Sequence, residues 1–258
     1  NMKFGLSTSS VYPESTAAAF EIAAATGYDG VEVMVGVDSM SQDSTVLRNL
    51  VQHYQIPILS LHAPCLLITQ REWGTDPWGK LVKADEVAQL VEANTVVVHP
   101  PFRWQLDYAR KFESGIAELN TNSSVNFTVE NMYPWRAGRG SVPAYAPDWD
   151  VRNQDYSSVT LDFSHTAVSR TDPLDMIRDL GSRLEHIHLA DGTESATDEQ
   201  IVPGRGTQPL DPALAALRDS GFNGTVITEI STRSAPTREA RIDDIRESLE
   251  IAKARLLT

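Results

Sequence analysis

Short runs of β-branched and apolar residues alternate with longer amphipathic stretches along the whole chain. The short runs are typical of buried β-strands, and the stretches between them have the apolar spacing of helices that bury one face. This alternation favours βα units and a parallel sheet. The expected strands are Lys3–Ser7, Gly30–Val35, Ile58–His62, Thr95–His99, Asn126–Glu130, Val159–Asp162, Leu184–Leu189 and Thr225–Ile230.

The expected helices carry start and stop signals. The first begins at Pro13 and ends before Gly27, in agreement with the preference of proline for helix starts and of glycine for helix ends. Only Met132–Ser158, rich in Pro, Gly, Trp and Arg, is irregular, and we expect one short helix there at most. The expected helices are Pro13–Thr26, Ser44–Tyr54, Pro77–Ala93, Trp104–Leu119, Asp172–Leu180, Asp211–Ser220 and Arg238–Leu257.

Eight βα units in about 250 residues are typical of a (β/α)8 TIM barrel. We therefore expect an α/β protein with a single TIM-barrel domain over residues 2–258. A doubly wound open sheet is the alternative, but such a sheet usually has a glycine-rich phosphate-binding turn after its first strand. The segment Leu6-Ser7-Thr8-Ser9-Ser10 contains no G-x-G-x-x-G motif.

Charge and composition favour a small-molecule ligand. The 258 residues include 35 Asp and Glu against 22 Lys and Arg, a formal net charge of −13. Such a surface repels phosphate backbones and anionic membranes, so neither nucleic acid nor a membrane is an expected partner. The single cysteine, Cys65, excludes an intrachain disulfide and fits a cytoplasmic location.

Metal-binding side chains recur at the carboxyl ends of six expected strands. In a TIM barrel these ends meet at one rim, where such enzymes have their active sites. Histidines there can be packing residues, but buried carboxylates are rare unless they are paired or bound to a metal. Histidine and carboxylate without thiolate predict one divalent cation, Mn²⁺, Mg²⁺, Co²⁺ or Zn²⁺. The side chains are His62, His99, Glu130, Asp162 with His165, His188 with Asp191, and Glu229.

These motifs, from GYDGVEV at Gly27–Val33 to ITEIS at Ile227–Ser231, resemble the xylose isomerase-like TIM-barrel superfamily. It contains sugar isomerases and epimerases, inosose dehydratases and endonuclease IV. In the sugar-handling members a Glu, an Asp, a His and a second Glu hold one metal. The resemblance implies that two of these residues are also catalytic and move protons on opposite faces of the substrate, and that a nearby His polarises a substrate oxygen. The matching ligands are Glu130, Asp162, His188 and Glu229, the catalytic pair is Glu130 and Glu229, and the polarising residue is His165.

The expected function is that of a divalent-metal-dependent isomerase or epimerase of a sugar, a sugar acid or an inositol-derived ketone. A metal that chelates a ketone and its neighbouring hydroxyl stabilises the enediolate formed when a carbon-bound proton leaves. One carboxylate can remove that proton and another can return it. An inosose dehydratase-like lyase and a non-catalytic sugar-binding barrel are alternatives. Many relatives form dimers or tetramers, so the protein could also be a homo-oligomer.

An endonuclease IV-like zinc phosphodiesterase is a further alternative. Its first metal site resembles His62, His99 and Glu130, which makes both histidines candidates for a second metal or for substrate. Its third site uses an Asp-x-His motif, and here Asp198 is present while Gln200 stands in place of the histidine. A neutral amide is a poor zinc ligand, and the net charge also argues against DNA.

The loop Tyr133–Trp149 is expected to lie over the rim. Trp135 is a candidate to stack on a sugar, and Arg136 and Arg139 are candidates to pair with a carboxylate or phosphate. Alternatively, the loop is a proline-stiffened segment that packs onto the barrel. Some epimerases have an acidic residue at the position of Arg136 and an arginine at the position of Glu194, so the substrate can differ from theirs.

Two other polar side chains are expected to be structural. Cys65, in the segment after the third expected strand, is interpreted as an inert loop thiol. His186 alternates with His188 along one strand, so both side chains point to the same side of the sheet. If His188 is a metal ligand, then His186 lies deeper in the barrel and has a buried structural role.

Overall fold

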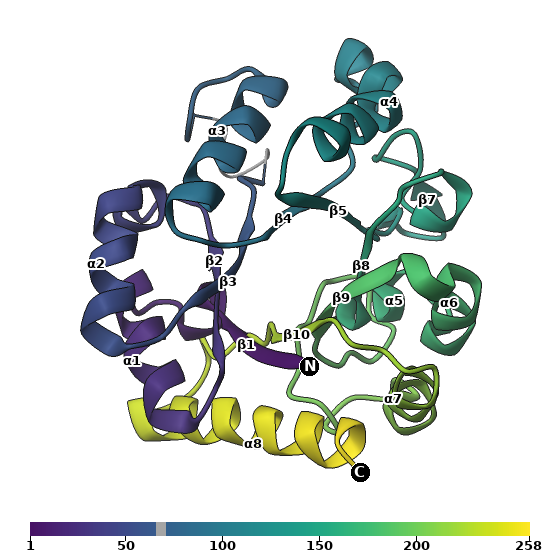
Figure 1. The fold of residues 1–258 in the computed structure, drawn as a ribbon. Coiled ribbons are helices and arrows are strands. Elements are labelled where there is room, and N and C mark those ends of the chain that lie inside the picture. The colour runs from purple at the N-terminus through teal and green to yellow at the C-terminus, as the bar shows by residue number, and fades with distance from the viewer. Residues whose placement is uncertain (66–70) are drawn as a thin grey trace.

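The protein is described by a computed structural model that covers residues 1–65 and 71–258. Within these ranges, eight parallel strands close into a barrel in the order β1-β2-β3-β4-β5-β8-β9-β10, and β10 pairs with β1. Helices surround the barrel (Figure 1), which confirms the predicted (β/α)8 TIM barrel. The barrel strands are β1 (Lys3–Ser7), β2 (Gly30–Met34), β3 (Ile58–His62), β4 (Thr95–Val98), β5 (Asn126–Glu130), β8 (Val159–Asp162), β9 (Leu184–Leu189) and β10 (Thr225–Thr228).

The α-helices of the described ranges are α1 (Thr16–Thr26), α2 (Ser44–Tyr54), α3 (Pro77–Leu90), α4 (Leu106–Asn122), α5 (Phe163–Ser169), α6 (Pro173–Leu180), α7 (Leu210–Asp219) and α8 (Arg238–Leu256). Capping side chains determine where several of them begin. Helix α1 begins after Ser15 and not at the predicted Pro13, because the Ser15 hydroxyl accepts a hydrogen bond from the Ala18 amide. None of these helices combines the length and the apolar character that a bilayer crossing requires.

The barrel interior beneath the rim is polar, which the sequence pattern did not reveal. Side chains two residues apart on a strand point to the same side, so Glu32, Ser60, Thr128, Thr160 and His186 point inward below the strand ends. All five are buried. The Thr128 and Thr160 hydroxyl oxygens lie 3.0 Å apart, and the Ser60 hydroxyl donates to Glu32 at 2.7 Å. Most apolar neighbours of these residues along the strands belong to the main hydrophobic core, for example Val33, Leu61 and Phe127.

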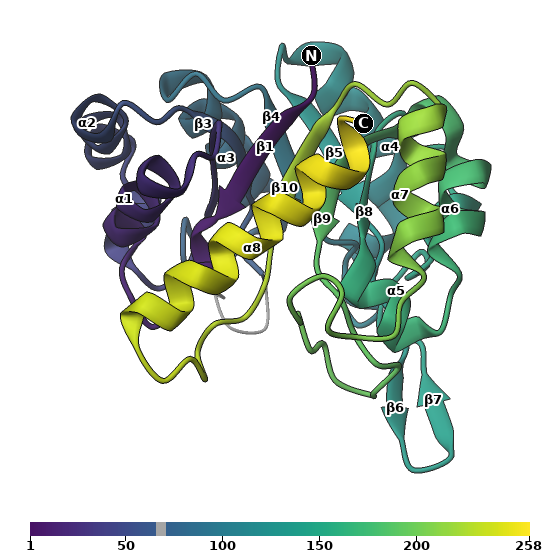
Figure 2. The ribbon, with the colours of Figure 1, turned by 90° about the horizontal axis from the view of Figure 1, so that it is seen from below.

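The irregular segment Met132–Ser158 contains a β-hairpin that the sequence pattern did not predict. Strands β6 (Trp135–Ala137) and β7 (Gly140–Val142) pair in antiparallel register. Gly138 adopts a φ of 59° between them, the conformation that a two-residue hairpin turn needs at its first position. The hairpin projects beyond the end of the barrel at which the strands terminate (Figure 2). The short helix expected in this segment is a single 3-10 turn at Val151–Asn153.

Gly115 of α4 lies against the indole ring of Trp78 of α3, where a methyl group has no room. A Cβ atom at Gly115 would lie 2.1 Å from Cη2 of Trp78. Although alanine favours helices more than glycine does, we expect Gly115→Ala to lower the free energy of unfolding by about 1–3 kcal/mol, because the ring must move. Urea denaturation followed by circular dichroism measures this change. In a Trp78→Phe background the smaller ring should reduce the cost, and an equal cost in both backgrounds would contradict the contact.

Candidate metal centre and substrate pocket

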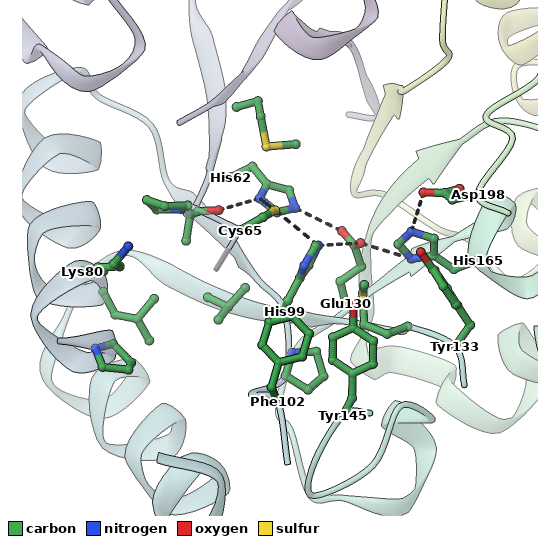
Figure 3. A pocket seen from close by; sticks show the side chains of 18 of the residues that line it. His62, Cys65, Lys80, His99, Phe102, Glu130, Tyr133, Tyr145, His165 and Asp198 are labelled. Atoms are coloured by element: carbon green, nitrogen blue, oxygen red, sulfur yellow. Dashed lines mark hydrogen bonds and ion pairs between the residues drawn. The ribbon is translucent and has the colours of Figure 1, made fainter. Parts of the chain in front are cut away.

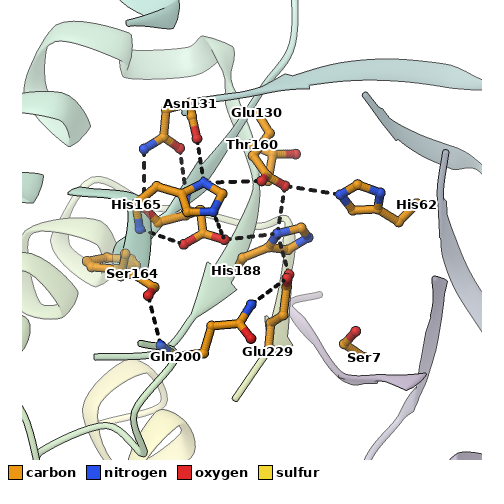
Figure 4. Close-up of polar contacts among 12 residues, drawn as sticks. Ser7, His62, Glu130, Asn131, Thr160, Ser164, His165, His188, Gln200 and Glu229 are labelled. Carbon is orange, nitrogen blue, oxygen red and sulfur yellow. Dashed lines mark hydrogen bonds and ion pairs between the residues drawn. The ribbon is translucent and has the colours of Figure 1, made fainter. Parts of the chain in front are cut away.

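The structure brings the four predicted metal ligands together at the rim. Glu130 ends β5, Asp162 ends β8, His188 lies in β9 and Glu229 follows β10, and all four side chains are buried. The Nδ1 atom of His188 lies 2.6 Å from Glu229 Oε2, 2.9 Å from Glu130 Oε1 and 3.5 Å from Asp162 Oδ2. Figure 4 shows His188 and the glutamates converging from different strands.

This donor set fits a divalent cation. Donor atoms about 2.1 Å from one cation lie about 3 Å from each other, and one donor atom from each of the four residues lies within 4.8 Å of the others. Within the described residues, His188 Nδ1, Glu130 Oε1 and Glu229 Oε2 are buried, and the contacts of the nitrogen with the two oxygens lack hydrogen-bond geometry. Buried polar atoms of this kind require a partner, and three carboxylates around one nitrogen require positive charge.

The pKa shifts of His188 and Glu229 also indicate that positive charge is favoured in this cluster. Burial lowers the pKa of His188, but Glu229, Glu32 and Glu130 outweigh burial and raise this pKa well above its ordinary value. The pKa of Glu229 rises to about 7, mainly because the carboxyl group is buried. His188 lowers this pKa, whereas the negative charges of Asp162 and Glu130 raise it. The carboxylates therefore hold a proton in their midst, and a cation that bound there would displace it.

Glu32, which the sequence analysis did not single out, orients His188 from below. Its Oε1 lies 2.7 Å from His188 Nε2, and its Oε2 accepts a hydrogen bond from Ser60 and lies 2.6 Å from His186 Nε2. Burial would raise the pKa of Glu32, but His188 and His186 lower it well below its ordinary value. An ionised Glu32 favours a proton on Nε2 of His188, so Nδ1 is the nitrogen that would bind a cation once its own proton is displaced. The only signal in the sequence was an acidic residue inside the apolar strand GVEV.

Asn131 and α5 fix Asp162 and His165 beside Glu130. The Asn131 side chain accepts a hydrogen bond from the Asp162 amide and donates one to the Asp162 carbonyl oxygen. Asp162 in turn caps α5, which the sequence analysis missed, by accepting a hydrogen bond from the His165 amide at 3.0 Å. The same carboxylate therefore starts a helix and belongs to the candidate ligand set.

His165 is suited to donate hydrogen bonds. Its Nδ1 lies 2.7 Å from the Asn131 carbonyl oxygen, and its Nε2 lies 3.1 Å from Asp198 Oδ2. Burial lowers the pKa of His165, but Asp162 and Asp198 raise it well above its ordinary value. The ring therefore carries a proton on both nitrogens at neutral pH. Gln200, at the position that departs from the endonuclease IV motif, donates a hydrogen bond to Glu229 Oε1 at 3.1 Å.

His62 and His99 approach Glu130 from the side opposite to His165 (Figure 3). The Nε2 atom of His62 lies 3.4 Å from Glu130 Oε1, and Nε2 of His99 lies 3.2 Å from Oε2. Cys65 lies at the rim, since its Sγ lies 4.0 Å from a nitrogen of each histidine, and its interpretation as an inert thiol stays a prediction. Burial would raise the pKa of this thiol, but His99 and His62 lower it to about 5.

A cavity of about 310 Å³ opens above these residues, within the size range of small-molecule sites. Its wall contains His62, His99, Glu130, His165 and Glu229 on the polar side. Figure 3 shows these polar groups facing an aromatic side, which Phe102, Tyr133 and Tyr145 provide.

The three predicted substrate residues of the hairpin do not line this cavity. Trp135 packs behind its wall, with its ring centroid 5.9 Å from that of Phe102. Arg136 donates hydrogen bonds to the carbonyl oxygens of Glu194 and Ser195, so it ties the hairpin to the loop after β9. Arg139 lies exposed at the hairpin tip. Their predicted contact with substrate stays a prediction.

We expect Glu32→Gln to weaken divalent metal binding by about 10–100-fold, because the amide keeps the shape of the carboxylate but no longer stabilises the proton on Nε2 of His188. Isothermal titration of the metal-free protein with Mn²⁺ measures the affinity. Glu118→Gln, an exposed position on α4, is the matched control and should bind as the unaltered protein does. Equal affinities in the two variants would contradict an orienting role for Glu32.

Comparisons with known proteins identify the family of the chain. The family model of the xylose isomerase-like TIM barrel matches residues 20–255. The chain is 46% identical over 275 residues to the uncharacterized protein Rv0498 of Mycobacterium tuberculosis, with 99% of this chain and 98% of that protein covered. It is 29% identical over 154 residues to D-psicose 3-epimerase of Agrobacterium fabrum, with 57% and 51% covered. The structure of D-psicose 3-epimerase from Clostridium cellulolyticum H10 with D-tagatose shares the fold, with a TM-score of 0.72 and 17% identity over 99% of each chain. The chain therefore belongs to the xylose isomerase-like TIM-barrel family.

Proposed function

We propose that this protein is a divalent-metal-dependent isomerase or epimerase that acts on a sugar, a sugar acid or an inositol-derived ketone. The observation that carries the proposal is the buried cluster of one histidine and three carboxylates, two of which, Glu130 and Glu229, line a single cavity together with His165. The relationship to D-psicose 3-epimerase over part of the chain makes ketoses the first substrates to test.

A cation held by Glu130, Asp162, His188 and Glu229 would, when bound, polarise a substrate carbonyl and stabilise the negative charge that develops as a carbon-bound proton leaves. In the proposed reaction one of the pair Glu130 and Glu229 takes a proton from carbon as a carboxylate on one face of the substrate. The other delivers a proton as a carboxylic acid on the opposite face, and exchange with solvent then restores both groups. A substrate oxygen would replace Asp198 as the acceptor of the hydrogen bond from Nε2 of His165.

The electrostatics of the two glutamates support different roles. In the metal-free protein, burial raises the pKa of Glu229 to about 7, and a cation bound beside this carboxylate would lower that pKa and favour the ionised form. Burial would raise the pKa of Glu130 as well, but His188 and His99 lower it well below its ordinary value. Two carboxyl groups whose pKa values are pushed apart are typical of an acid and base pair.

We expect Glu229→Gln to slow exchange of a carbon-bound proton with solvent by at least about 100-fold, because the amide cannot accept that proton. Incubation with D-fructose, D-psicose, D-tagatose and an inosose in D2O, followed by mass spectrometry, measures deuterium uptake. Glu118→Gln on the outer helix is the matched control. If Glu229→Gln exchanges protons at the rate of this control, Glu229 is not the base.

Removal of the cation is expected to abolish the same exchange. Dialysis against a chelator should stop deuterium uptake, and addition of Mn²⁺, Co²⁺, Mg²⁺ or Zn²⁺ should restore it in the unaltered protein. Asp162→Asn should require much more metal for the same rate, because one anionic ligand is lost. Full activity in the chelated protein, with no metal found by plasma mass spectrometry, would refute metal dependence.

A second candidate is an endonuclease IV-like phosphodiesterase, since His62 and His99 both lie close to Glu130. The net charge of −13 disfavours DNA, and Gln200 uses its amide as a donor to Glu229. Zinc-dependent cleavage of abasic DNA would support this candidate. Loss of water from an inosose would indicate a lyase, and sugar binding without deuterium uptake would indicate a non-catalytic barrel.

A further inference from the structure

Lys80 places a positive charge in the wall of the substrate cavity. It lies near the start of α3, where its amide donates a hydrogen bond to the Asp76 carbonyl oxygen at 3.0 Å. The loops that lead from a barrel strand to the next helix lie at the rim with the active site, so the start of α3 lies there too. Lys80, Ala84 and Val87 have the spacing of one helix face, and all three are buried. A lysine therefore occupies the inner side of α3.

The burial of Lys80 favours a negative charge beside it, because lysines are rarely buried unless they are paired. Only 2% of the residue is exposed. Burial lowers the pKa of Lys80 below its ordinary value, although Glu72 raises this pKa. The ammonium form would therefore gain stability from a further anion. Figure 3 shows the amino end of the side chain directed away from α3 and toward the cavity.

The cavity has two chemically different sides. Glu130 and Glu229 of the candidate metal centre belong to its wall, and Lys80 lies on the side away from His165 and Asp198 (Figure 3). Because one cavity of about 310 Å³ connects the two sides, a single small substrate can face both. A ketone bound at the metal centre would leave the far end of the substrate near Lys80.

The charge balance of the wall favours a carboxylate at that far end. Among the described residues that line the cavity, Lys80 is the one lysine or arginine. A carboxylate has a single negative charge, which one ammonium group balances, whereas a phosphate group carries about −1.5 to −2 at pH 7. The histidines of the wall each lie 3.2–3.4 Å from a Glu130 oxygen, so their contacts are with that carboxylate; they are His62, His99 and His165.

We propose that Lys80 binds a carboxylate at the end of the substrate that lies away from the metal centre, and that the substrate is a keto sugar acid and not a neutral ketose. This inference rests on the proposed function, because the metal centre must hold the ketone for Lys80 to meet the other end. A hydrogen bond from an ammonium group to a carboxylate is stronger than one between neutral groups. A site built for such a contact rejects the analogue that lacks the charged group.

Matched pairs of ligands test this contact. D-fructuronate and D-tagaturonate differ from D-fructose and D-tagatose at the terminal carbon, where a carboxylate replaces a hydroxymethyl group. Isothermal titration in the presence of Mn²⁺ measures the four affinities. We expect at least one acid to bind at least about tenfold more tightly than its neutral partner. Lys80→Met should abolish this preference and leave the affinity for the neutral ketose within about twofold. Lys83→Met, at a side chain of α3 that is 42% exposed, is the matched control and should keep the preference.

Three outcomes would overturn the proposal. The first is that no acid binds more tightly than its neutral partner, and the second is equal affinity for the acid in Lys80→Met and Lys83→Met. The third is tighter binding of D-fructose 6-phosphate than of D-fructuronate with a loss in Lys80→Met, which would indicate a phosphate site. Replacement of a buried charge by an apolar side chain of similar volume is often tolerated, and Lys80→Gln is the second variant if circular dichroism shows that Lys80→Met does not fold.

The titrations separate this inference from the proposed activity, because they require no turnover. Acid binding that depends on Lys80, without deuterium uptake, would refute the isomerase alone. Deuterium uptake from neutral ketoses, without any preference for the acids, would refute the role of Lys80 alone.

Discussion

Glu32 places a negative charge in the middle of the barrel, and the orientation of His188 depends on it. The carboxylate accepts a hydrogen bond from Ser60 and contacts His186 and His188 with both of its oxygens. A buried charge of this kind is tolerated only when it is paired, and removal of one partner of a buried pair costs about 3–5 kcal/mol. The arrangement leaves Nδ1 of His188 pointing toward the carboxylates of the rim, where we propose that a cation binds.

Closure of the barrel brings the other candidate metal ligands to His188. Strand ends that are far apart in the sequence meet at one rim, so Glu130, Asp162 and Glu229 surround a nitrogen whose orientation is determined below them. Phe102, Tyr133 and Tyr145 close the cavity on one side, and Trp135 of the hairpin packs behind Phe102. The strands also contribute to the main apolar core, and apolar burial is the dominant favourable term in folding.

The fold and the clustering of the four candidate ligands could be predicted from the sequence, whereas the supporting contacts could not. Strand periodicity and the polar residues at six strand ends are local patterns, and parallel topology then brings those ends together. Glu32 and His186 are 154 residues apart, so their contact follows from the closure of the barrel and from no local pattern. Cys65 is the single cysteine of the sequence, and no local pattern indicates its position beside His62 and His99. Helix α5 was missed because it has only seven residues and begins directly after the strand.

X-ray diffraction from crystals grown with Mn²⁺, recorded on both sides of the manganese absorption edge, tests the proposed metal centre most directly. We expect an anomalous peak about 2.0–2.3 Å from His188 Nδ1 and from one oxygen each of Glu130, Asp162 and Glu229, with His188 Nε2 still facing Glu32. A peak only at other positions, or His188 turned so that Nδ1 faces Glu32, would contradict the centre and the role of Glu32 in orienting it.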